Sequence, residues 1–163
     1  MAFTLLLWCS VTAANAQWVQ QKKEDPFDGK HLYIAVTASG AYGFGVRCEA
    51  GSDRPELILI TPEKLDSAAT NLLNLTSPKL VIIVDDSSPR EVDATLSTGD
   101  EGQLIIASDD EPVAALAAEL VLARKRVAVA VAAGGEKFHK TQFGVSGTKR
   151  AVGSVVAGCK PKN

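Results

Sequence analysis

A serine and a lysine near the end of the chain, Ser146 and Lys149, have the spacing of a known catalytic pair. In penicillin-recognising acyl-transferases, a Ser-x-x-Lys motif places the lysine amine where it helps to take the proton of the serine nucleophile. Those enzymes also carry Ser-Asp-Asn and Lys-Thr-Gly motifs, and neither occurs in this sequence. Because serine is a favoured N-cap, we expect Ser146 to cap the last helix and Lys149 to lie on its solvated side.

Two consecutive carboxylates, Asp85 and Asp86, follow the continuous apolar run KLVIIV. Acidic side chains at the carboxyl edge of strands serve as metal ligands or catalysts in many α/β enzymes. Asp-Asp-Ser-Ser-Pro is also an ordinary strand-ending turn, and we favour this interpretation. A small hydrolase that uses Ser146 and Lys149, or Asp85 and Asp86, is the alternative.

Two cysteines lie beyond the first sixteen residues, Cys48 and Cys159. In an exported protein such a pair predicts a disulfide. Two unpaired thiols or a metal site are the alternatives. A metal site needs further ligands, and the histidines, His31 and His139, have no ligand spacing with either cysteine. We therefore expect a disulfide and neither a metal nor a cofactor.

The first sixteen residues, MAFTLLLWCSVTAANA, contain no charge and carry an apolar run over residues 3–11. They end in a small-x-small pattern, Ala-Asn-Ala, which is typical of a secretory signal peptide cleaved after Ala16. The run is shorter than the roughly 20 apolar residues that span a bilayer. The sequence thus predicts a signal peptide over 1–16 and one exported domain over 17–163, located in the periplasm or secreted.

The charge balance gives little indication of an ionic partner. Lys and Arg number 17 against 19 Asp and Glu, a formal net charge of −2. This balance offers no electrostatic surface for nucleic acid or for an anionic membrane. No stretch after the leader approaches transmembrane length. We expect a protein partner in the cell envelope.

Short apolar segments with two-residue periodicity predict most of the chain as β-strands. Residues 17–30 are polar and are predicted to be an exposed lead-in. Residues 62–77 could form a short helix or a loop, and within them Asn74-Leu-Thr76 matches a glycosylation sequon. Turn residues join the first three strands as a meander. The expected strands are 31–38, 44–48, 56–61, 79–84, 90–96, 103–107, 127–133 and 136–145.

Two helices are expected late in the chain. The first starts with the capping and proline signals of residues 109–112 and ends at the cations of residues 124–126. The second follows Ser146, and its apolar stripe would carry Cys159 towards the strand of Cys48. The fold class is therefore one α+β domain, mostly an antiparallel, sandwich-like β-sheet with two late helices and one disulfide.

Two side-chain placements follow from the last strands. In residues 127–133, valines alternate with alanines, so we expect the valines to line one face and a helix to pack closely over the alanines. In residues 136–145, Phe138 and Phe143 are the expected aromatic anchors.

The two ends of the chain resemble a known family. Trp18 stands soon after the leader, Asp-Pro-Phe follows at residues 25–27, and a strand ends in Val-Arg-Cys48. The chain closes with Phe143-x-Val-Ser-Gly, an Ala- and Val-rich helix, and Cys159. This pattern is similar to small exported bacterial proteins of the VasI-like group, associated with type VI secretion, and more distantly to invasion-associated locus B proteins.

The resemblance implies a non-enzymatic envelope protein with a mostly β fold and one disulfide. The leading hypothesis from the sequence is thus a periplasmic or secreted binding or accessory protein. An inhibitor or immunity-type protein for a secreted enzyme is a further alternative.

Overall fold

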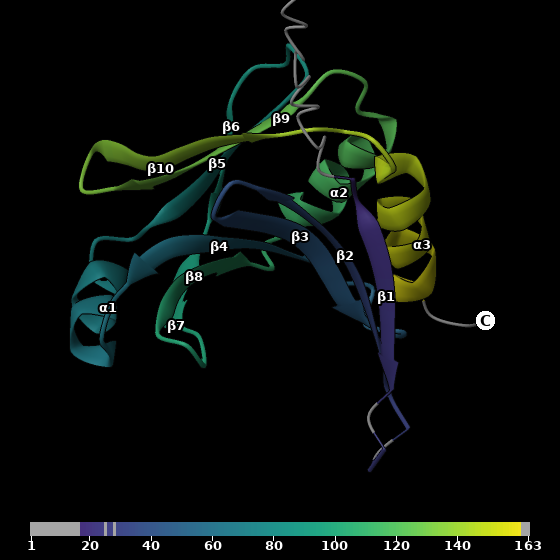
Figure 1. Cartoon of the computed structure of the whole chain (residues 1–163), viewed down its shortest axis with the longest axis horizontal. Coiled ribbons are helices and arrows are strands. Elements are labelled where there is room, and N and C mark those ends of the chain that lie inside the picture. Colours follow the sequence, from purple (N-terminus) through teal and green to yellow (C-terminus); the bar gives the residue numbers. More distant parts are fainter. Residues whose placement is uncertain (1–16, 25, 28, 161–163) are drawn as a thin grey trace, which may run out of the picture.

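The structure is a computed structural model that describes residues 17–24, 26–27 and 29–160. The predicted leader, residues 1–16, lies outside the described residues. The described chain folds into two antiparallel sheets that pack across one another, with two of the helices against one end of the sheets (Figure 1). The predicted α+β fold with mostly antiparallel strands is confirmed.

The larger sheet has six strands in the order β1-β2-β3-β4-β8-β7, and every neighbouring pair is antiparallel. Hairpins join β2 to β3 and β3 to β4, which confirms the predicted meander. The strands are β1 (Val19–Glu24), β2 (His31–Ser39), β3 (Tyr42–Glu49), β4 (Glu56–Lys64), β7 (Thr95–Thr98) and β8 (Gln103–Ser108).

The smaller sheet has four strands in the order β10-β9-β5-β6, again antiparallel throughout. Its strands are β5 (Lys79–Val84), β6 (Arg90–Asp93), β9 (Val127–Ala133) and β10 (Glu136–Phe143). The valines of β9 are buried, as their alternation predicted, because they face the core between the sheets.

Three helices complete the described fold: α1 (Ser67–Asn74), α2 (Pro112–Leu122) and α3 (Thr148–Cys159). The last helix packs against α2 and against the inner face of the larger sheet at β2 and β3. Buried side chains from both sheets and from α2 and α3 form one hydrophobic cluster. The largest of them are Trp18, Phe44, Phe143, Leu57, Leu59, Leu80, Ile82, Ile106, Leu116 and Leu120.

The lead-in differs from the prediction. Most side chains between Gln17 and Glu24 are exposed, as expected, but the backbone of this segment pairs with β2 as the edge strand β1. Trp18 is buried and belongs to the core. Polar residues suit an edge strand because its free edge faces water, so their composition hid the strand.

Residues 62–77, which could have been helix or loop, begin as the end of β4 and continue as α1. Asp66 caps this helix by accepting a hydrogen bond from the backbone of Ala69 at 2.8 Å. The described fold therefore has one early helix besides the two late ones. The predicted strand over 90–96 is in fact two strands, because the chain leaves the smaller sheet after β6 and joins the larger one as β7.

Three further placements differ from the sequence prediction. Gly147, with φ of 87°, is the N-cap of α3, and Ser146 precedes it. Phe143 is buried, but Phe138 is 38% exposed and anchors nothing in the core. The alanines that alternate with the valines of β9 are only half-buried. Two of them, Ala128 and Ala130, line a surface hollow with Lys137 and other residues of β5 and β10 rather than lying under a helix.

Candidate functional site: an apolar groove on the outer face of the larger sheet

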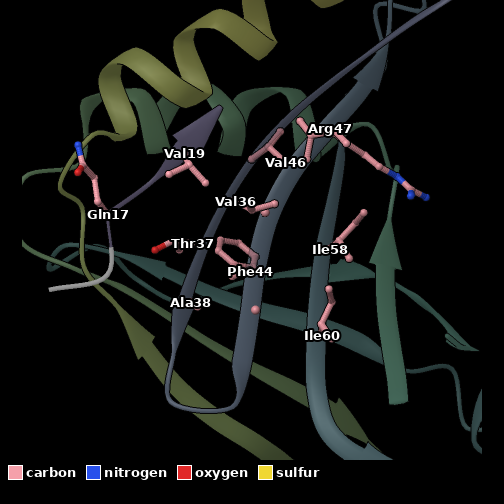
Figure 2. A pocket seen from close by; sticks show the side chains of 13 residues that line it. Gln17, Val19, Val36, Thr37, Ala38, Phe44, Val46, Arg47, Ile58 and Ile60 are labelled. Atoms are coloured by element: carbon pink, nitrogen blue, oxygen red, sulfur yellow. The ribbon is translucent and has the colours of Figure 1, made fainter. Parts of the chain in front are cut away.

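A groove of about 550 Å³ lies on the outer face of the larger sheet, on the side away from the core (Figure 2). This volume falls within the range of about 300–1,000 Å³ that is typical of ligand sites. The groove crosses β1, β2, β3 and β4. Its lining is Gln17, Val19, Ile34, Val36, Thr37, Ala38, Gly43, Phe44, Gly45, Val46, Arg47, Ile58 and Ile60.

The groove exists because β2 and β4 carry apolar side chains on both faces. On β4, Leu57 and Leu59 point into the core and are fully buried, while Ile58 and Ile60 point outwards. Such continuous apolar runs are normally found in strands covered on both sides. Here the outward residues stay partly exposed, with Val19 at 48% and Ile60 at 37%. This surface is therefore apolar but open to solvent.

Two glycines on β3 form the floor of the groove. Gly43 lies opposite Ile60 of β4, and Gly45 lies opposite Ile58. Neither has a side chain to fill the space between the outward residues of the neighbouring strands. At Gly45 the absence is required, since an added Cβ would lie 2.7 Å from the backbone oxygen of Ala35. At Gly43 an added Cβ would lie 3.5 Å from the side chain of Ile60, which is ordinary van der Waals contact, so a methyl group would fit there.

The electrostatics of the groove are neutral. Among the described lining residues, Arg47 is the only one with a formal charge, and its Nε donates to the carboxylate of Glu56 on the next strand. Each member of this ion pair therefore has its counter-charge beside it. The groove offers an apolar surface with a compensated ion pair at its edge.

Trp18 fixes the edge strand that bounds the groove. Its backbone N–H donates to the carbonyl of Ser146 at 2.8 Å, and its indole Nε1–H donates to the carbonyl of Gly144 at 2.8 Å. Its ring meets the ring of Phe44 edge-on, with centroids 5.9 Å apart. The start of β1 is thus tied to the segment before α3, which sequence reasoning missed because the partners are more than 120 residues apart.

Ser146 and Lys149 lie where α3 begins, Ser146 just before the N-cap residue Gly147 and Lys149 in the first turn. Both side chains are exposed, and no hydrogen bond joins them within the described part of the chain. The first turn of α3 is closed instead by Thr148, whose hydroxyl donates to the carbonyl of Val145 at 2.9 Å. Lys149 lies on the solvated side of the helix, as predicted.

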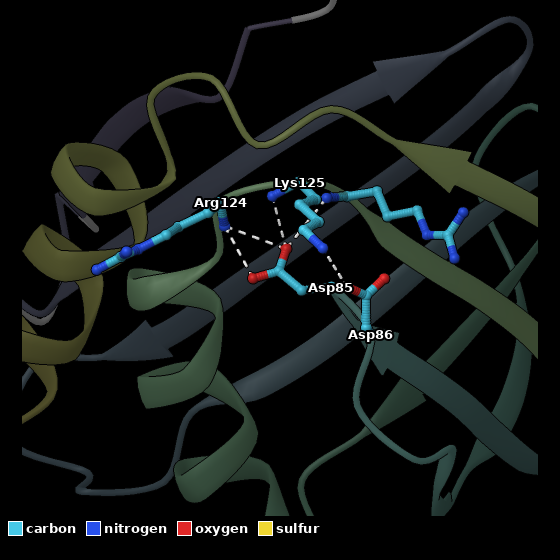
Figure 3. A network of polar contacts seen from close by, with 5 residues as sticks. Asp85, Asp86, Arg124 and Lys125 are labelled. Carbon is cyan, nitrogen blue, oxygen red and sulfur yellow. Dashed lines mark hydrogen bonds and ion pairs between the residues drawn. The ribbon is translucent and has the colours of Figure 1, made fainter.

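Asp85 and Asp86 hold together a turn of the smaller sheet (Figure 3). The carboxylate of Asp85 accepts hydrogen bonds from the backbone N–H groups of Arg124, Lys125 and Arg126, at 2.6–3.2 Å. Asp86 pairs with the ammonium of Lys125. Residues 124–126 therefore lie beyond α2, which ends at Leu122. Their backbone N–H groups bind the carboxylate of Asp85 instead of belonging to the last turn of the helix.

These contacts shift the pKa values of Asp85 and Lys125. The backbone N–H of Lys125, aided by those of Arg124 and Arg126, lowers the pKa of Asp85, although partial desolvation acts in the opposite direction. Hydrogen bonding to Asp86 raises the pKa of Lys125. The contacts thus favour the charged forms of Asp85 and Lys125. The carboxylates of Asp85 and Asp86 hold the turn together, which is the turn interpretation that we favoured from the sequence.

Cys48 and Cys159 lie at disulfide distance, with Cα atoms 5.8 Å apart, inside the usual range of about 4.4–6.8 Å. Tyr33 stands opposite Cys48 in the β2–β3 pairing. The ring of Tyr33 also fills the space beside Gly158, where an added Cβ would lie 2.6 Å from it. The pair thus joins the end of α3 to the inner face of β3, as the apolar stripe of the helix predicted.

His139 belongs to a cluster that the sequence does not reveal. Its Nε2 lies 2.8 Å from the Glu63 carboxylate, and its Nδ1 lies 3.4 Å from the Tyr42 hydroxyl. The three side chains come from β10, β4 and β3, so they connect the two sheets. His139 has a φ of 49°, at an irregularity in β10 that no sequence pattern signals. His31 lies 3.9 Å from the Glu24 carboxylate, too far for a hydrogen bond.

The described residues contain no group of three or more His, Cys, Asp or Glu side chains arranged to hold a metal ion. None of the helices described here has the length and hydrophobicity needed to cross a bilayer. Comparisons with family models, with curated proteins and with solved structures found no match to this chain.

Proposed function

We propose that this chain is an exported, non-enzymatic binding or accessory protein of the cell envelope, and that the groove on the outer face of its larger sheet is the binding surface. The observation that carries this proposal is the row of outward apolar side chains, Val36, Ile58 and Ile60, beside the bare floor at Gly43 and Gly45. Exposed apolar surface of this kind is characteristic of interaction sites.

The chemistry of the groove favours apolar side chains of a partner protein as its occupant. A charged ligand would find no unpaired charge among the described lining residues, because Arg47 is already paired with Glu56. A strand or helix from a partner could place apolar side chains beside Ile60 over Gly43, where an added methyl group would make only ordinary contact. Burial of these groups would supply the binding energy, at roughly 25 cal/mol per Å² of apolar surface.

Export is supported by two features of the sequence and one of the structure. The apolar segment over 3–11 and the Ala-Asn-Ala pattern before Gln17 are typical of a cleaved signal peptide. The cysteines at disulfide distance suit an oxidising compartment. A link to type VI secretion rests only on the resemblance of the two chain ends to VasI-like proteins, and an inhibitor or immunity role would use the same groove.

A photo-crosslinking experiment in the envelope tests the proposal. A photoreactive residue at Ile58 should give a discrete adduct with one protein, and the same residue at Leu122, which is 73% exposed on α2, should not. Adding Val36→Glu to the Ile58 probe should abolish the adduct, because the charge would enter the groove. Equal labelling from both positions, or an adduct that survives Val36→Glu, would contradict the proposed surface.

A further inference from the structure

The edge of the groove carries a residue that can modify itself. We propose that Gln17, once it becomes the first residue of the exported chain, cyclises to pyroglutamate. This inference rests on the proposed export, with cleavage after Ala16. It assigns a modification site to the groove, and the N-terminus of the mature protein would then be an uncharged lactam.

The step needs no other reactant. The unprotonated α-amine of Gln17 attacks the carbonyl carbon Cδ of its own side chain, so the N–Cδ bond forms and the Cδ–Nε2 bond breaks. The side-chain nitrogen leaves as ammonia and takes up a proton from the attacking amine. The product is a five-membered lactam, and nothing is oxidised or reduced. An ordinary α-amine has a pKa of about 7.7–8.0, so a useful fraction is unprotonated near neutral pH.

The structure leaves Gln17 accessible to solvent. Gln17 is exposed, and within the described part of the chain no hydrogen bond holds its side-chain amide. The next residue, Trp18, is held in place because it is buried and donates hydrogen bonds from both its backbone N–H and its indole N–H. Cyclisation uses only atoms of Gln17, so the hydrogen bond from the Trp18 N–H to Ser146 is kept in the product.

The position of Gln17 gives the modification a consequence for binding. Gln17 and Val19 lie side by side at the edge of the groove (Figure 2). With a free N-terminus, an unpaired ammonium group would be placed at the edge of a groove whose other charged lining residue, Arg47, is paired with Glu56. A docking apolar partner would have to remove water from that charge, which opposes binding. The lactam carries no charge, so cyclisation makes this edge neutral.

Mass spectrometry of the purified mature protein tests the inference. The wild-type N-terminal peptide, released by cleavage after Lys22, should be lighter by one ammonia than the Gln17 peptide with a free amine, and should not react with amine reagents. Gln17→Asn is the matched control. It keeps a side-chain amide, but its lactam would be a strained four-membered ring, so this variant should retain a reactive α-amine.

The possible failures can be distinguished. A mature chain that begins at Gln17 and keeps a free amine after prolonged incubation at neutral pH would overturn the cyclisation and leave export intact. A chain that retains residues 1–16, or begins at another residue, would overturn both the cyclisation and the cleavage on which it rests. Loss of the reactive α-amine from the Gln17→Asn peptide as well would show that the amine is blocked by another reaction and would also overturn the inference.

Discussion

The side chain of Asn74 pairs with the backbone of Leu96 as one strand pairs with another. Its Nδ2 donates to the Leu96 carbonyl at 2.9 Å, and its Oδ1 accepts from the Leu96 N–H at 2.8 Å. This two-way contact joins the end of α1 to β7, the edge strand that follows the change of sheet. The residue that begins the glycosylation sequon is therefore engaged in the fold.

We expect Asn74→Ala to lower the free energy of unfolding by about 1–3 kcal/mol, since it leaves both polar groups of Leu96 without their partner. Urea unfolding measures this difference. Asn71→Ala is the control, because Asn71 lies exposed on the same helix and its loss should change stability by no more than about 0.5 kcal/mol. Equal effects of the two substitutions would contradict the role of the Asn74–Leu96 pair.

The cysteine pair should contribute substantially to stability, because it closes a loop with a sequence separation of 111. Replacing Cys48 and Cys159 together by alanine should lower the free energy of unfolding by about 2–5 kcal/mol. Urea unfolding with and without a reductant provides the internal control. The wild type should lose stability in the reductant, and the double variant should not respond to it. A wild type that is insensitive to reductant while its thiols react freely would exclude the disulfide.

Asp85 should make stability fall in acid. Its pKa is lower in the folded chain than its ordinary value of about 3.9, so folding stabilises the ionised form of the Asp85 carboxyl group. This contribution is complete above the ordinary value and is lost as the pH falls through the lowered folded value. We expect Asp85→Asn to reduce the melting temperature at neutral pH, and the difference from wild type to shrink in strong acid.

Asparagine is chosen at position 85 because it tolerates the φ of 55° that Asp85 adopts. Asp86→Asn is the matched control, since Asp86 makes only an exposed ion pair with Lys125 and should change stability little. A difference between Asp85→Asn and wild type that stays constant from neutral pH into strong acid would contradict the proposed anion site.

The two glycines of the groove floor should differ in their tolerance of a methyl group. Gly45→Ala should destabilise the chain by about 1–3 kcal/mol, because its Cβ would press on the backbone of β2 at Ala35. Gly43→Ala should be neutral or slightly stabilising, since its Cβ only touches Ile60 and alanine suits a strand better than glycine. Thermal unfolding of the two variants measures the difference. A larger loss of stability in Gly43→Ala than in Gly45→Ala would contradict the described floor of the groove.

Local sequence patterns predicted the parts of the fold that depend on local chemistry. Alternating apolar residues and turn signals predicted the β2–β3–β4 meander. The apolar stripe of α3 predicted that Cys159 would face the strand that carries Cys48. The change of sheet at Ala94 was missed, because β6 and β7 read as one alternating segment. Which sheet each half joins is decided by distant partners, Val92 with Leu80 of β5 and Leu96 with Ile106 of β8.

The candidate site was harder to predict. The strands β2 and β4 were predicted, but an apolar strand that is covered on both faces and one that is exposed on one face can have the same sequence. Gly43 fell in the predicted turn and Gly45 in the predicted strand 44–48, and only the strand pairing shows that both leave a bare floor. The cluster of His139 with Glu63 and Tyr42 depends on three separate strands and has no local signal.

The most direct test of the binding surface is the affinity of the purified partner for groove variants. Ile58→Glu should weaken binding at least about 30-fold, as expected for a central contact worth 2 kcal/mol or more. Leu122→Glu, an equally polar change on exposed α2, should leave the dissociation constant unchanged. If Ile58→Glu binds as tightly as wild type while both variants remain folded, the groove is not the binding surface of this protein.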